Sequence, residues 1–255
     1  MFRVLDDRPG SRAAVSIARP GPLLVCAHVR ATADAADLTG LRVLLIADLL
    51  LRAAEVGGLQ VLVTRAFTGE LAGKADVERA AAVLGVHPPA ADLAGAWPDG
   101  VPVVHVADDS ALGEDDRGEI LIRAAAARLA RDARPGDAAA GALGGQDPLA
   151  VRLSLLSLPR HQPTELTAGM LTDATQKLRE WRRRVAGWAE SPSGAIPRPT
   201  AATMREAFGN LDTIAVVALL SGLAADETVP PGPRFETFLY ADRVLGLNLP
   251  RDIGR

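Results

Sequence analysis

Two apolar runs of strand length, separated by one segment of helix length, constrain the fold more than any other feature of this sequence. Leu23–Ala27 (LLVCA) and Leu59–Thr64 (LQVLVT) are short apolar runs of the kind that form strands covered on both faces. Between them, apolar residues from Leu41 to Val56 recur at helical spacing, and Gly57-Gly58 supplies a C-terminal stop. Strand, helix and strand with short connections predict a right-handed βαβ unit with a parallel strand pair.

The rest of the chain divides into three parts around this unit. Residues 1–110 are expected to form a partial Rossmann-like domain, with further strands at Ala13–Ile17 and Val101–Val106 and a helix at Asp76–Leu84. Residues 111–148 contain a predicted helix, Glu119–Arg131, followed by a linker rich in glycine, alanine and proline.

Residues 149–255 are expected to be helical throughout and to form a small bundle. In its first long helix, apolar residues from Leu171 to Trp188 step by three and four, and Thr167 is placed as the N-cap. The opposite face carries Arg182-Arg183-Arg184, which predicts a solvated face rather than a phosphate-binding one. Further helices are predicted through Met204–Phe208, Thr213–Leu223 and Arg234–Leu245, so the predicted class is α/β plus α.

Composition excludes several classes of protein. The 28 Lys and Arg against 31 Asp and Glu give a net charge of −3, which argues against a generally basic surface that coats nucleic acid. The apolar runs are too short to span a bilayer, and the first twelve residues contain no secretory signal, so we expect a soluble, cytoplasmic protein. The single cysteine excludes an intramolecular disulfide framework and every multi-cysteine zinc site.

Few residues carry recognisable chemistry. Cys26 and His28 lie two apart at the end of a predicted strand and so share a face, but two ligands alone make a weak metal site, and a structural thiol is favoured. The run Gly69–Ala75 follows a strand and contains Gly-Lys, yet its glycines are too closely spaced for a phosphate loop. It predicts a turn that leads into a helix.

The order of several segments carries a family resemblance. LLVCAHVR (23–30), the stretch from DLTG to AFTG (37–69) and VLGVHPP (83–89) resemble the N-terminal half of the catalytic domain of class I cysteinyl-tRNA synthetases. Residues 146–185 resemble the helical region after that family's KMSKS loop, and DRVLGLNL (242–249) resembles the end of the bundle. Within this family the chain is most similar to the actinobacterial mycothiol cysteine ligase branch. The resemblance implies a partial Rossmann-like parallel sheet of the HUP type, followed by a helical bundle.

The departures from that family concern its catalytic groups. The HIGH motif falls on Asp37-Leu38-Thr39-Gly40, so both histidines are absent, and an aspartate there would repel phosphates. Arg42 matches the arginine after the motif. Residues 110–146 are too few for the second half of the family's nucleotide fold and contain no lysine for a KMSKS loop. Cys26 matches the first of the family's four zinc ligands. One ligand does not hold zinc, so neither zinc nor any other cofactor is expected. No residue is predicted to be catalytic or a metal ligand.

Two hypotheses follow. In the first, the chain is a catalytically degenerate protein with a non-catalytic binding or accessory role. A second copy or another protein would then cover the truncated sheet, or the chain would bind a small-molecule ligand. In the second, it is a divergent ligase or transferase that uses ATP. The candidate ligand-binding residues are Cys26, His28, Asp37, Gly40, Arg42 and Thr68.

Each of these positions also has a purely structural interpretation. Asp37 would cap a helix, Arg42 would form a surface ion pair and Thr68 would end a strand. Binding of tRNA through Arg179–Arg184 is a weaker idea, because the chain is acidic and lacks a basic field elsewhere.

Overall fold

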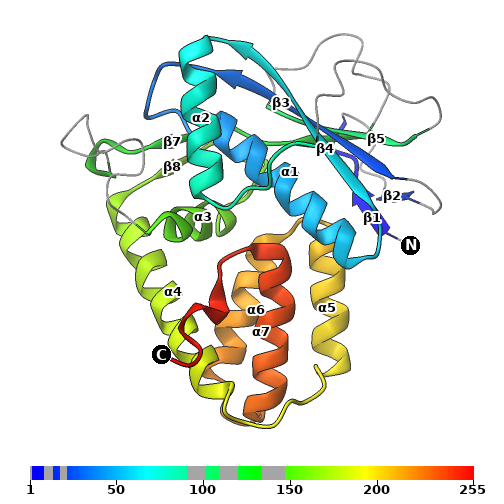
Figure 1. Ribbon diagram of the computed structural model, residues 1–255, viewed down its shortest axis with the longest axis vertical. Coiled ribbons are helices and arrows are strands. Elements are labelled where there is room, and N and C mark those ends of the chain that lie inside the picture. Colours follow the sequence, from blue (N-terminus) through cyan, green and yellow to red (C-terminus); the bar gives the residue numbers. More distant parts are fainter. Residues whose placement is uncertain (1, 9–13, 18–21, 91–100, 109–119, 134–146) are drawn as a thin grey trace.

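A four-stranded parallel sheet forms the centre of the N-terminal half in the computed structural model (Figure 1). The residues that the structure describes are 2–8, 14–17, 22–90, 101–108, 120–133 and 147–255. The strand order is β4-β3-β5-β6, and the strands are β3 (Leu23–Ala31), β4 (Val61–Gly69), β5 (Val103–Ala107) and β6 (Ile120–Arg123). This is the predicted Rossmann-like α/β arrangement, and the parallel pairing of β3 with β4 is confirmed.

Helix α1 (Thr39–Val56) connects β3 to β4 and lies between the sheet and the C-terminal helices (Figure 1). It is apolar on nearly every side, and all but three of its 18 residues are buried. A helix without a polar face is stable only when it is enclosed, which explains its central place. Helix α2 (Leu71–Val83) follows β4 directly, so Gly69–Ala75 is a turn into a helix, as predicted.

The predicted helix at Glu119–Arg131 is wrong. These residues form β6, the short strand β7 (Ala127–Leu129) and the start of a 3-10 turn at Arg131–Ala133. The alanine-rich sequence suits a helix, but Ile120–Arg123 fills the open edge of β5 as a fourth parallel strand. Pairing with β8 (Thr164–Leu166) holds part of the alanine-rich run, Ala127–Leu129, in a strand against its helix propensity.

Two smaller sheets flank the central one. Strands β1 (Phe2–Leu5) and β2 (Ala14–Ile17) form an antiparallel pair, and the second of them was predicted. Strand β7 pairs in parallel with β8 (Thr164–Leu166), which the expectation of an all-helical C-terminal region missed. The linker expected after residue 133 lies outside the described residues as far as residue 146.

The C-terminal region is a helical bundle packed under α1 (Figure 1). Its elements are α3 (Pro148–Leu156), α4 (Ala168–Trp188), α5 (Arg198–Gly209), α6 (Thr213–Ala225), α7 (Pro231–Leu245) and a final 3-10 turn (Leu249–Asp252). The predicted N-cap of α4 is confirmed, because Thr167 Oγ1 accepts a hydrogen bond from Met170 N at 3.3 Å. None of the described helices is long and apolar enough to cross a membrane.

Arg182 does not lie on a solvated face, contrary to the expectation from the spacing. Its side chain is fully buried and donates to Asp147 Oδ2 at 2.9 Å and to the carbonyl oxygens of Leu247 and Asn248. The segment after α7 folds back over this side of α4 and covers it. Arg183, the next residue, is exposed.

A second buried guanidinium joins the bundle to the α/β region. Arg152 of α3 donates to Asp48 Oδ2 at 2.6 Å and to the carbonyl oxygens of Leu84 and Leu245. Asp48 lies in α1, Leu84 follows α2 and Leu245 ends α7. One side chain therefore fixes the relative positions of three helix segments.

Candidate functional site

Strands β3 and β5 bring together three side chains that can bind a ligand, in the middle of the strands and not at the strand end that the sequence predicted. Cys26 and His28 lie two residues apart on β3 and point to the same face of the sheet. The Cα partner of Cys26 on the neighbouring strand β5 is His105, so its side chain projects from that face too. In parallel sheets of this class ligands bind at the carboxyl ends of the strands, which lie a few residues beyond these three.

These three side chains are in close contact. His28 Nε2 and His105 Nδ1 lie 2.8 Å apart, at hydrogen-bond distance, and the two rings are tilted by 35° with centroids 5.0 Å apart. The Cys26 sulfur and one nitrogen of each histidine all lie within 4.8 Å of one another. Cys26 and His105 are buried, whereas His28 is half-buried. Among the described residues this is the cluster that can hold a metal ion.

Thr68 lies further along the same sheet face. It pairs with Arg30, two residues beyond His28, and both are exposed near the strand ends. The register therefore places Thr68 with Cys26 and His28 on one side of the sheet. Thr64, which pairs with Cys26, is buried on the same face.

Asp37 lies at the start of α1. Its Oδ1 accepts a hydrogen bond from Thr39 N at 2.9 Å, and its Oδ2 accepts one from Thr32 Oγ1 at 3.4 Å. Thr39 N is one of the free donors at the first turn of a helix, where anions bind. The carboxylate of Asp37 therefore satisfies this donor from the position before the N-cap, which is Leu38, so Asp37 is not itself the predicted cap residue.

Gly40 allows α1 to approach the sheet closely. A Cβ atom at this position would lie 2.9 Å from Val29 Cγ1 and 3.6 Å from Val77 Cγ2. Both contacts lie on the α1 side of the sheet, opposite the face that carries Cys26. Gly40 thus has a packing role that any larger residue would disturb.

Arg42 is not a surface residue. Its side chain is buried, and its donors reach the carbonyl oxygens of Ala125, Gln162 and Pro159. Burial, with a smaller contribution from the charge of Arg160, lowers the pKa of Arg42 to about 10. Among the described residues its acceptors are main-chain carbonyls, so this guanidinium holds the segments around β7 and β8 against α1.

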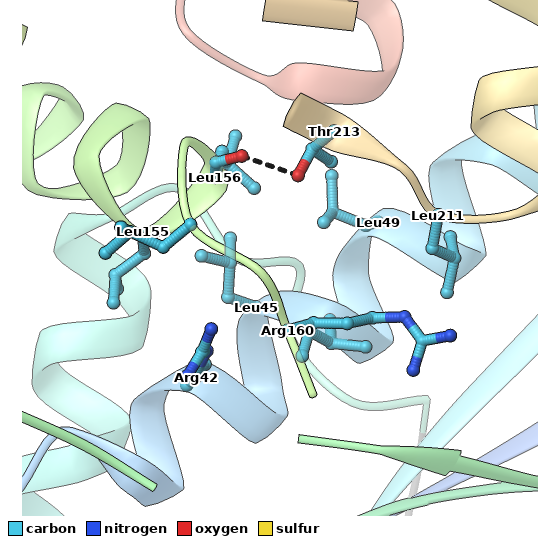
Figure 2. A pocket seen from close by; sticks show the side chains of 10 residues that line it. Arg42, Leu45, Leu49, Leu155, Leu156, Arg160, Leu211 and Thr213 are labelled. Atoms are coloured by element: carbon cyan, nitrogen blue, oxygen red, sulfur yellow. Dashed lines mark hydrogen bonds between the residues drawn. The ribbon is translucent and has the colours of Figure 1, made fainter. Parts of the chain in front are cut away.

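A small cavity lies beside Arg42, between α1, α3 and the start of α6 (Figure 2). Its walls are mostly leucine side chains, and Thr213 Oγ1 closes one side by donating to Leu156 O at 2.6 Å. Its volume of about 10 Å³ leaves room for no more than a water molecule. This cavity is a packing defect rather than a substrate site.

Comparison with known proteins gives one informative match. The chain is 32% identical over 106 residues to an L-cysteine:1D-myo-inositol 2-amino-2-deoxy-alpha-D-glucopyranoside ligase of Acidothermus cellulolyticus. No family model matches the sequence.

The match is partial. It covers 41% of this chain, and the chain spans a quarter of the length of that relative. The similarity agrees with the resemblance in the sequence. The activity and substrates of the relative belong to that protein.

The six candidate residues fall into two groups. Cys26, His28 and Thr68 share one face of the sheet, whereas Asp37, Gly40 and Arg42 lie at the start of α1 on the other. Sequence reasoning did not include His105 among the candidates. Its position in a predicted strand was the available signal, but its pairing with Cys26 depends on a register that the sequence does not reveal.

Proposed function

We propose that this chain is a ligase-like protein that keeps its α/β fold for binding and does not form an adenylate. The proposal depends mainly on Asp37, whose carboxylate accepts the hydrogen bond of Thr39 N at the start of α1. A phosphate bound there would lie beside a carboxylate of like charge and would compete for a donor already in use.

The contacts of Arg42 and of the two lysines support the same conclusion. Arg42 donates to main-chain carbonyls and is buried. Both lysines of the chain lie over aromatic rings, Lys74 Nζ at 5.0 Å from the Phe67 centroid and Lys177 Nζ at 5.9 Å from the Trp181 centroid. These groups are engaged in holding the fold together.

The name of the similar ligase gives the ligand class to test first. That protein acts on L-cysteine, so we propose cysteine or a related small thiol as the ligand of this chain, bound on the sheet face that carries Cys26 and His28. A second copy or another protein covering the sheet is proposed as the partner. Light scattering of the purified chain distinguishes a dimer from a monomer.

Thermal unfolding with ligands tests the proposal. We expect a non-hydrolysable cysteinyl-adenylate analogue to raise Tm no more than cysteine alone, because the nucleotide adds no favourable contact. ATP alone should leave Tm unchanged. A clearly larger shift with the analogue than with cysteine would contradict the proposal.

A divergent ligase that uses ATP is the second candidate. The observation that favours it is that Cys26, His28 and Thr68 share one sheet face, with Thr68 at the carboxyl end of its strand, where α/β enzymes bind substrates. Stabilisation by the adenylate analogue would support this candidate over the first.

A further inference from the structure

The side chains of Cys26, His28 and His105 converge because of strand register. Cys26 and His105 are Cα partners on adjacent parallel strands, and His28 follows Cys26 by two residues. Strand alternation sends all three side chains to one face. The positions of the ligand atoms are thus determined by the backbone of two central strands, which are among the most rigid parts of such a fold.

The distances suit one small ion. Zinc binds thiolate sulfur at about 2.3 Å and imidazole nitrogen at about 2.0–2.1 Å, so tetrahedral ligand atoms lie about 3.3–3.6 Å apart. Here the two facing nitrogens are 2.8 Å apart, and all three ligand atoms lie within 4.8 Å of one another. Zinc binding would therefore require the two nitrogens to move apart by about 0.5 Å.

We infer that Cys26, His28 and His105 form a zinc site. One thiolate and two imidazoles suit zinc and other borderline transition metals, whereas Mg²⁺ and Ca²⁺ require oxygen ligands. Three protein ligands leave a fourth tetrahedral position for water or for an atom of a bound ligand. Zinc sites with three protein ligands are typical of sites that bind or activate a ligand.

Zinc binding moves one proton within a histidine ring and releases one proton from the Cys26 thiol. In the metal-free state, one of the two facing histidine nitrogens carries the proton of their hydrogen bond. When zinc binds both nitrogens, that proton moves to the other nitrogen of the same ring. The Cys26 thiol loses its proton to solvent and binds as thiolate.

This ligand set is not the one that the family resemblance implies. That resemblance supplied Cys26 alone and placed the other ligands in a segment missing from this chain, whereas the structure supplies two histidines from β3 and β5. The zinc site also does not depend on the proposed loss of adenylation. A result that contradicts one of the two proposals therefore leaves the other unaffected.

Cobalt(II) titration of the full chain, first freed of metal with a chelator, tests the site. We expect one equivalent of Co²⁺ to bind with a thiolate-to-cobalt charge-transfer band and the visible bands of tetrahedral cobalt, both abolished by added Zn²⁺. Cys26→Ser should lose the charge-transfer band. His105→Gln should weaken Co²⁺ binding at least about 100-fold, since changes outside the ligand shell alone cost 10–100-fold.

His161→Gln is the matched control, because His161 is exposed and lies away from the cluster in sequence. It should titrate like the unmodified chain. Absence of the charge-transfer band in the unmodified chain would overturn the inference, and so would His105→Gln binding cobalt as tightly as the control. The charge-transfer band is measured on the unmodified chain, so the inference can be overturned even if a variant fails to fold.

Discussion

Asp48 Oδ2 and Arg152 Nη2 lie 2.6 Å apart, and both side chains are completely buried between α1 and α3. Arg52 Nε and His87 Nδ1 also contact this carboxylate, at 2.8 Å and 2.7 Å. A buried carboxylate with three cationic or donor partners acts as a structural link between the α/β region and the bundle. The pair is a contact through which the two halves of the chain depend on each other for stability.

Arg152→Met removes the buried partner of Asp48. We expect the free energy of unfolding to fall by about 3–5 kcal/mol, because the buried carboxylate loses its fully buried partner and the carbonyl oxygens of Leu84 and Leu245 lose their donor. Urea denaturation followed by circular dichroism measures this change. The control is Asp76→Asn, which breaks the exposed pair with Arg79 and should have little effect. Equal stability of the two variants would contradict the role given to Arg152.

The free energy of unfolding should fall in acid, in part because Asp48 becomes protonated. Burial opposes ionisation of this carboxyl, but the hydrogen bond from His87 and the charges of Arg152 and Arg52 outweigh it and hold the pKa well below its ordinary 3.8. A carboxyl with a lowered pKa in the folded state contributes stability above its ordinary pKa and loses it as the pH falls toward the folded-state value.

Asp48→Asn isolates this contribution. Between about pH 5 and pH 3, the free energy of unfolding of the unmodified chain should fall more steeply than that of Asp48→Asn. Burial raises the pKa of Asp242, which gives the opposite dependence, but that effect is present in both proteins and cancels. If the free energies of unfolding of the two proteins fell equally with pH, Asp48 would not be the source of the loss of stability in acid.

Gly40→Ala should destabilise the packing of α1 on the sheet. The new Cβ would lie 2.9 Å from Val29 Cγ1, and relieving this overlap is expected to cost about 1–3 kcal/mol. Gly222→Ala in α6 is the matched control, since nothing lies within 4 Å of a Cβ there. It should stabilise the chain by about 0.5–1 kcal/mol through helix propensity. Thermal unfolding of both variants should therefore give Tm changes of opposite sign.

Arg182→Ala and Arg183→Ala distinguish a buried arginine from its exposed neighbour. Loss of the Arg182 bonds to Asp147 and to two carbonyls should cost roughly 2–4 kcal/mol. Arg183 is exposed, and its replacement should change stability little. Chemical denaturation of the pair measures the difference, and equal losses would contradict the burial of Arg182.

The strand and helix segments with clear periodicity were predictable from the sequence. The βαβ unit of β3, α1 and β4 and the four long helices of the bundle follow from apolar spacing and from caps such as Thr167. These signals are local, so a single sequence carries them.

Long-range pairings were not predictable. The strand at Ile120–Arg123 runs directly into an alanine-rich segment that favours a helix, and its conformation is decided by the free edge of β5. Arg182 carries no sign of its burial, because the segment that covers it lies beyond α7. The contact of His28 with His105 joins residues 77 positions apart, and only the register of β3 with β5 brings them together.

Pyrophosphate exchange into ATP tests the central claim most directly. The purified chain, assayed with ATP, labelled pyrophosphate and cysteine, should show no exchange above the cysteine-free blank. The reason is that the carboxylate of Asp37 holds the first-turn donor of α1, while Arg42 is engaged with carbonyl oxygens. Exchange that depends on cysteine would show that this chain forms an adenylate and would contradict the account.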